Sequence, residues 1–256
     1  MLARLRQSVL VYVLLLVLAS AWLTQQRTRS WQNTLWVEIN PISASENTQV
    51  SEFITSLELK DFAPMENYLN AQANQFDVNL ARPFRIDLGP QLHSLPPVLP
   101  TQGSWLQAVL WSLRMRWWAM STTWSLEGPE PDIRLFTVFH DPTATVTLER
   151  SVALQKGMVA IANLFAEQAT QGSNLVVATH ELLHTLGATD KYDRATNLPI
   201  YPEGFADPQR NPRYPQPNAE IMAGRIPLTE TEAAIPASLR YTRIGPKTAQ
   251  EIGWQP

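Results

Sequence analysis

Apolar residues along the chain follow two patterns, one that alternates with polar residues and one with helical spacing. Alternation predicts a strand over residues 35–39, ended by Pro41, and residues 84–88 and 133–139 are two further strand candidates. Residues 152–165 are typical of a hairpin that turns near Lys156 and Gly157. Helical spacing predicts four further segments: residues 50–74, divided into two helices by Pro64; a helix capped by Ser104; a helix from Ser173 to Gly187; and a short helix over residues 246–252.

The order of these segments predicts the fold class. Strands and helices come first, one central helix follows, and the rest is dominated by loops, with six prolines between Pro199 and Pro217. We therefore expect an α+β fold over residues 34–256, with two lobes separated by a cleft and the central helix beneath the cleft.

The N-terminus carries a long apolar run. Residues 8–23 contain no charged side chain and would form a helix of roughly 24 Å. This is slightly short of the ~20 residues that span a bilayer, and longer than the ~7–15 residues of a signal-peptide core. With Arg4 and Arg6 before it, the run favours an uncleaved transmembrane anchor (residues 1–24) and a polar tether (residues 25–33) over a cleaved signal peptide. We expect a single-pass membrane protein whose catalytic domain lies on the exported side, periplasmic or extracellular.

The composition of the chain excludes several classes of function. The 256 residues carry 20 basic and 23 acidic side chains, and no block of like charge is present, which excludes the basic surface that nucleic-acid binding requires. Cysteine is absent, which excludes disulfides, thiolate metal ligands and cysteine nucleophiles.

The segment THELLHTLGATDKYD, residues 179–193, contains the most specific pattern. His180 and His184 are four residues apart, so on a helix they project from one face about 6 Å from each other. Two imidazoles in this arrangement can hold one zinc ion, with Glu181 beside the metal as a proton acceptor. Gly187 would end the helix in a left-handed turn, from which Asp190 can return to the metal as a third ligand. The alternative is a surface helix with two ordinary histidines, but two of only four histidines fall at the ligand spacing.

This segment resembles the zinc-binding motif of metzincin-type metallopeptidases in which aspartate replaces the third histidine. It is most similar to the snapalysin-like and immune inhibitor A-like peptidases. The resemblance implies a metzincin-like domain with His180, His184 and Asp190 as zinc ligands and Glu181 as general base. It also implies a methionine turn below the metal, which residues 219–224 (AEIMAG) would supply with Met222.

Tyr192, two residues after the third expected ligand, is a candidate for supporting the substrate or the developing oxyanion. The sequence thus predicts a membrane-tethered zinc (Zn²⁺) endopeptidase that acts on peptide or protein substrates, contacts the membrane through its N-terminal helix and binds no nucleic acid. Two alternatives stay open: a catalytically silent zinc scaffold that serves as a binding or assembly module at the membrane, and a metal-dependent hydrolase of another substrate class.

Overall fold

A five-stranded mixed sheet forms the centre of the computed structural model, which describes residues 12, 30–100, 105–145, 148, 151–155 and 158–254. The strand order is β2-β1-β3-β5-β4. Strands β2, β1, β3 and β5 are parallel, and the short edge strand β4 is antiparallel to β5. Their bounds are β1 Leu35–Ser43, β2 Phe84–Leu88, β3 Ile133–His140, β4 Val152–Leu154 and β5 Val159–Phe165.

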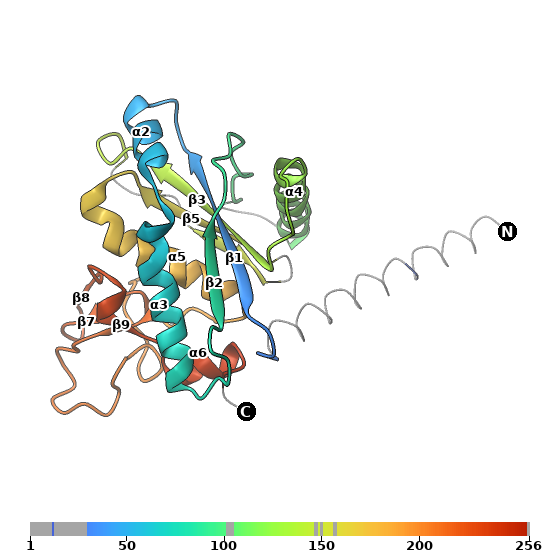
Figure 1. Ribbon diagram of the computed structural model, residues 1–256. Helices are drawn as coiled ribbons and strands as arrows, with labels where there is room; N and C mark the ends of the chain where they lie inside the picture. Colours follow the sequence, from blue (N-terminus) through green and yellow to red (C-terminus); the bar gives the residue numbers. More distant parts are fainter. Residues whose placement is uncertain are drawn as a thin grey trace.

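Helices cover both faces of this sheet (Figure 1). On one face lie α2 (Thr48–Ser56), α3 (Leu59–Gln75) and α5 (Gln171–Thr185), whose apolar side chains share the larger hydrophobic core with β1, β2, β3 and β5. The opposite face is covered by α4 (Trp105–Thr123), which forms a second, smaller core with side chains of β1, β3 and β5. Helix α5, which carries His180, Glu181 and His184, is therefore anchored in the larger core.

After α5 the chain forms short elements joined by loops. They are β6 Ala219–Glu220, η3 Ile221–Ala223, β7 Ile226–Pro227, β8 Ala233–Ala234, η4 Leu239–Tyr241, β9 Thr242–Arg243 and α6 Pro246–Glu251, and the 3-10 turn η2 (Gln168–Thr170) precedes α5. Strand β6 pairs with β9 and β7 pairs with β8, so this part is held by two-stranded ladders rather than by the main sheet. The loop-rich C-terminal part expected from the sequence is present.

Two proline predictions are wrong, for reasons the structure gives. Strand β1 continues past Pro41, because β2 ends earlier and the Pro41 carbonyl instead accepts a hydrogen bond from the Leu92 backbone N–H at 2.9 Å. Proline has no backbone N–H to donate, and β2 has already ended beside Pro41, so the sheet needs no hydrogen bond from that position. Helices α2 and α3 are separated at Leu57 and Glu58, not at Pro64, which lies exposed inside α3.

The prediction of a transmembrane helix is corrected. Apart from Tyr12, the apolar run over residues 8–23 lies outside the described residues. The turn residues 156–157 of the expected hairpin also lie outside them. Within the described part of the chain, no helix combines the length and the apolar character needed to cross a bilayer. The fold is α+β with a mixed sheet, and both the transmembrane helix in the predicted fold class and the single-pass membrane location are overturned by this finding.

Candidate metal centre

Helix α5 owes its position to apolar residues on one side and to one asparagine near its start. Leu175, Ala178 and Leu182 are buried in the larger core at the three- and four-residue spacing of a helix face. The Asn174 amide donates to the Phe165 carbonyl at 2.8 Å, and its oxygen accepts from the Phe165 N–H at 3.2 Å. Because Phe165 ends β5, these bonds fix the start of α5 at the end of that strand. The helix begins at Gln171, two residues before the predicted Ser173.

The C-terminal end of α5 forms a Schellman turn. Gly187 has φ of 106°, its N–H bonds the His184 carbonyl, and the Ala188 N–H bonds the Leu183 carbonyl, both at 3.1 Å. The left-handed turn predicted at Gly187 is thus confirmed. It reverses the chain so that the Ala188 carbonyl accepts a hydrogen bond from His184 Nδ1 at 2.7 Å.

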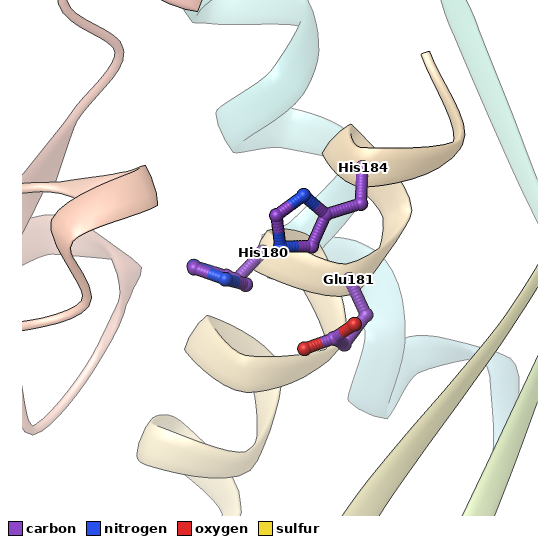
Figure 2. Close-up of side chains that lie close together, drawn as sticks. All are labelled: His180, Glu181 and His184. Atoms are coloured by element: carbon purple, nitrogen blue, oxygen red, sulfur yellow. The ribbon is translucent and has the colours of Figure 1, made fainter. Parts of the chain in front are cut away.

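Three candidate ligand atoms meet beside α5. Asp190 Oδ1 lies 3.3 Å from His180 Nε2 and 3.0 Å from His184 Nε2. Figure 2 shows the two imidazoles extending from consecutive turns of the helix, and their ring centroids are 4.7 Å apart. Ligand atoms around a tetrahedral zinc ion with bonds of about 2.0–2.1 Å are separated by about 3.3 Å, so these atoms fit a single ion.

The hydrogen bonds of the two imidazoles support this fit. His180 Nδ1 bonds the Ile221 carbonyl at 2.9 Å, just as His184 Nδ1 bonds the Ala188 carbonyl. A carbonyl oxygen only accepts, so both Nδ1 atoms carry the proton and both Nε2 atoms are directed toward Asp190 Oδ1. Two nitrogen lone pairs and a carboxylate oxygen at such distances require positive charge between them, either a cation or protons on the imidazoles. Carbonyl partners of this kind orient the imidazoles of metal sites.

Burial and charge act in opposite directions on these groups. Burial alone would lower the pKa of His180, but its contacts with Asp190 and the charge of Glu181 outweigh burial and raise it. Burial alone would raise the pKa of Asp190, yet the hydrogen bonds from His180 and His184 hold it well below its usual range. The carboxylates of Asp190 and Glu181 therefore favour positive charge at the imidazoles, whether it comes from a proton on Nε2 or from a bound cation.

Glu181 is buried, with 6% of its surface exposed. One of its carboxylate oxygens and one nitrogen of each imidazole all lie within 4.8 Å of one another, and Figure 2 shows the three side chains projecting from α5. Asp190 is the better candidate for a third ligand, because its Oδ1 atom contacts both Nε2 atoms. This leaves the Glu181 carboxylate beside the site, in reach of a group held there.

Met222 belongs to the short 3-10 turn η3 and is fully buried in the larger core. The carbonyl before it, Ile221, bonds His180, and its own carbonyl accepts from the Lys191 N–H at 2.9 Å. The turn therefore orients one candidate ligand, His180, and holds Lys191, which follows the candidate ligand Asp190. It is braced by Glu220, which is fully buried and whose carboxylate accepts hydrogen bonds from four donors: the N–H groups of Met222, Ala223 and Gly245 and the hydroxyl of Thr248.

A second brace holds Asp190 from both sides. The Lys191 ammonium, 3% exposed, bonds Glu251 Oε2 at 2.7 Å and the Thr189 carbonyl at 2.8 Å. Glu251 also accepts from the Thr189 N–H and hydroxyl, each at 2.9 Å. Since Thr189 and Lys191 flank Asp190, Glu251 of helix α6 holds the residues on either side of that candidate ligand.

A cleft of about 690 Å³ opens onto the three candidate ligands and Glu181. Val176 and Val177 of α5, Val152 and Ala153 of β4, and Ile235 contribute apolar wall. Tyr192 also lines this cleft, with its ring centroid 6.4 Å from that of His180, and Arg194 bonds Asp190 Oδ2 at 3.1 Å.

Every site residue singled out in the sequence lies at or beside this centre. The sequence did not indicate Arg194, the braces Glu220 and Glu251, or the two carbonyls that hold the imidazoles. Only Arg194 had a local signal, because it stands four residues after Asp190. No protein-family model matches the chain, and a search of curated proteins finds no significant relative. The resemblance to metzincins thus stays a prediction from the motif.

Proposed function

We propose that this protein is a zinc-dependent endopeptidase. The observation that carries the proposal is the convergence of Asp190 Oδ1 on the Nε2 atoms of His180 and His184, at 3.3 and 3.0 Å, while both Nδ1 atoms are held by backbone carbonyls. Two imidazoles and one carboxylate are a ligand set typical of catalytic zinc, which keeps a fourth position open. Zinc bound there supplies a Lewis acid and lowers the pKa of water.

The protein side chains then have distinct roles. Glu181, buried beside the ligands, accepts a proton from the attacking water on its carboxylate and passes it to the leaving amine. His180 and His184 stay neutral and oriented through their Nδ1–H bonds. Arg194 fixes the second oxygen of Asp190, so that the first stays directed at the imidazoles.

The wall of the cleft favours a peptide over other hydrolysable substrates. Strand β4 is one of the two edge strands of the sheet, and Val152 and Ala153 line the same cleft as the candidate ligands. An exposed strand edge offers N–H and C=O groups that can pair with an extended peptide. A substrate bound in this way would pass directly over the ligands, which supports peptide hydrolysis at this site.

The test combines zinc content with peptide cleavage by the purified full chain. We expect about one zinc per chain by elemental mass spectrometry, and affinity reduced by more than about 100-fold in Asp190→Ala, because loss of an outer partner alone costs 10–100-fold. Cleavage of a mixed peptide library should disappear in Glu181→Gln while zinc content is unchanged. The matched control is Glu203→Gln, which alters an exposed loop carboxylate.

Each result decides between the alternatives. A folded wild-type chain that takes up no zinc would overturn the metal centre. One zinc without cleavage of any library peptide would instead identify a silent zinc scaffold. Cleavage that persists in Glu181→Gln would refute the role of that carboxylate.

A further inference from the structure

One charged side chain in the cleft has no role in the candidate metal centre. The charged residues that line the cleft, among those the structure describes, are Glu181, Asp190, Arg194 and Arg225. Glu181 and Asp190 lie beside the two imidazoles, and Arg194 bonds the second carboxylate oxygen of Asp190 at 3.1 Å. The side chain of Arg225 has neither an ion pair nor a hydrogen bond with any described residue. Its guanidinium is therefore available to a ligand.

The short ladder after the methionine turn holds Arg225 at the cleft. Strand β7 pairs with β8 in antiparallel register, with Ile226 opposite Ala234. Continued by one residue, this register sets Arg225 opposite Ile235, and both of these residues line the cleft. Only one residue separates Arg225 from η3, the turn whose backbone orients His180. The position of Arg225 is thus tied to that of a candidate ligand.

The surroundings of Arg225 make it a suitable partner for a carboxylate. Arg225 is partly buried, and much of the remaining cleft wall is apolar, so a charge pair formed there is screened less than one on an open surface. The guanidinium presents paired N–H groups that match the two oxygens of a carboxylate. Neither carboxylate of the cleft occupies it, because Glu181 and Asp190 form no ion pair with Arg225.

We propose that Arg225 determines substrate specificity by binding a carboxylate of the peptide, so that this protein cleaves peptides with aspartate or glutamate near the scissile bond. The inference rests on the proposed peptidase function and adds the class of peptide that the site selects. A second source of the same group is the C-terminal carboxylate, which would bring the last residues of a peptide to the metal centre. In either case Arg225 positions the substrate and takes no part in the proton transfer assigned to Glu181.

The test measures peptide binding apart from cleavage, in the full chain with Glu181→Gln and in the presence of zinc. Labelled peptides of equal length carry one glutamate or one glutamine at the same position, which is moved along the peptide, and a C-terminal amide. By fluorescence anisotropy the best glutamate peptide should bind at least about tenfold more tightly than its glutamine counterpart, because hydrogen bonds between charged groups are the stronger ones. Arg225→Gln should remove this preference, and Arg210→Gln, which changes an exposed arginine outside the cleft, should not.

Two further variants separate recognition from a loss of folding. Arg225→Glu should favour the matching lysine peptide, a gain that a misfolded chain cannot produce. Arg225→Lys, which keeps the charge without the paired N–H groups, should retain part of the preference. In cleavage by the chain with Glu181 intact, the glutamate peptide should have a KM at least about tenfold lower with little change in kcat, because the contact is the same before and during the reaction.

The outcomes distinguish this inference from the proposed function. Equal binding of the glutamate and glutamine peptides, or no binding of any peptide at about 1 mM, would overturn the inference. A preference that Arg194→Gln removes and Arg225→Gln leaves intact would overturn it as well. Tighter binding of a glutamine peptide with a free C-terminus than of its amide, lost in Arg225→Gln, would assign Arg225 to the C-terminal carboxylate. A binding preference without cleavage would uphold Arg225 and refute the peptidase, whereas cleavage without the preference would do the reverse.

Discussion

The buried ion pair between Lys191 and Glu251 allows a quantitative test of how the candidate ligand Asp190 is held. Lys191 is 3% and Glu251 16% exposed at the side chain, and their charged atoms lie 2.7 Å apart. Burial alone would raise the pKa of Glu251, but the hydrogen bonds from Lys191 and Thr189 outweigh it and lower that pKa. The change to make is Glu251→Ala, which leaves the ammonium buried with only the Thr189 carbonyl and hydroxyl as partners.

Removing one partner of a buried pair costs about 3–5 kcal/mol, and we expect the lower end because two of the ammonium's hydrogen bonds remain. For a chain of this size about 3 kcal/mol lowers Tm by roughly 6–12 °C. Zinc affinity should fall about 10–100-fold, because Thr189 and Lys191 no longer fix the backbone around Asp190. In Lys191→Met/Glu251→Leu most of the stability should return, since no charge is left buried and the exposed Thr189 can bond water.

Calorimetric melting of the wild type, the single and double variants, and the exposed control Glu203→Ala measures these differences. Because the pKa of Glu251 is lowered on folding, the pair contributes stability above the ordinary value of 4.5, and that stability is lost as pH falls through the lowered pKa. The gap between the wild type and Glu251→Ala should therefore close in acid. A Glu251→Ala melt within 2 °C of the wild type at neutral pH, or a double variant less stable than Glu251→Ala, would refute the reasoning.

Three further changes test the surrounding structure. Gly187→Ala places a Cβ in a left-handed turn at φ of 106° and should cost about 1–2 kcal/mol in urea unfolding, whereas Ala188→Gly should cost less. Glu220→Ala leaves three buried N–H donors and a hydroxyl without their acceptor, at about 1–3 kcal/mol each, so we expect at least 3 kcal/mol by the same measurement. Removal of zinc by a chelator should lower Tm, because free zinc at 100 times its Kd adds about 2.7 kcal/mol, and an unchanged Tm would contradict binding to the folded state.

The parts of the fold that the sequence predicts are those with a strong local period. Strand β2 occupies the predicted residues 84–88, and α5 brings His180 and His184 to one face because four residues make about one helical turn. Gly187 ends that helix as its position suggests, since a left-handed residue costs glycine the least. Each of these features depends on neighbours within a few residues.

Features that depend on distant residues could not be predicted. The period of α4 indicates a helix, but only the packed structure shows that Trp111 and Trp118 are buried while Trp117 is exposed. Pro64 ends helices in general, yet α3 continues through it because Phe62 and Met65 on either side are buried in the larger core. Tertiary packing thus decided both the face of α4 and the boundary between α2 and α3.

The groups that orient the candidate ligands could not be predicted from the sequence for a further reason. A backbone carbonyl belongs to every residue, so nothing in the identities of Ile221 or Ala188 marks them as partners of the two imidazoles. These carbonyls, together with Glu251, tie α5 and Asp190 to segments of the C-terminal part that have little regular structure of their own. Zinc held by His180, His184 and Asp190 would stabilise those segments as well, because the ligands can converge only while the carbonyl of Ile221 stays in place. Metal affinity and the packing of the C-terminal part are therefore coupled, so that substitutions in η3 or α6 should weaken zinc binding without touching a ligand.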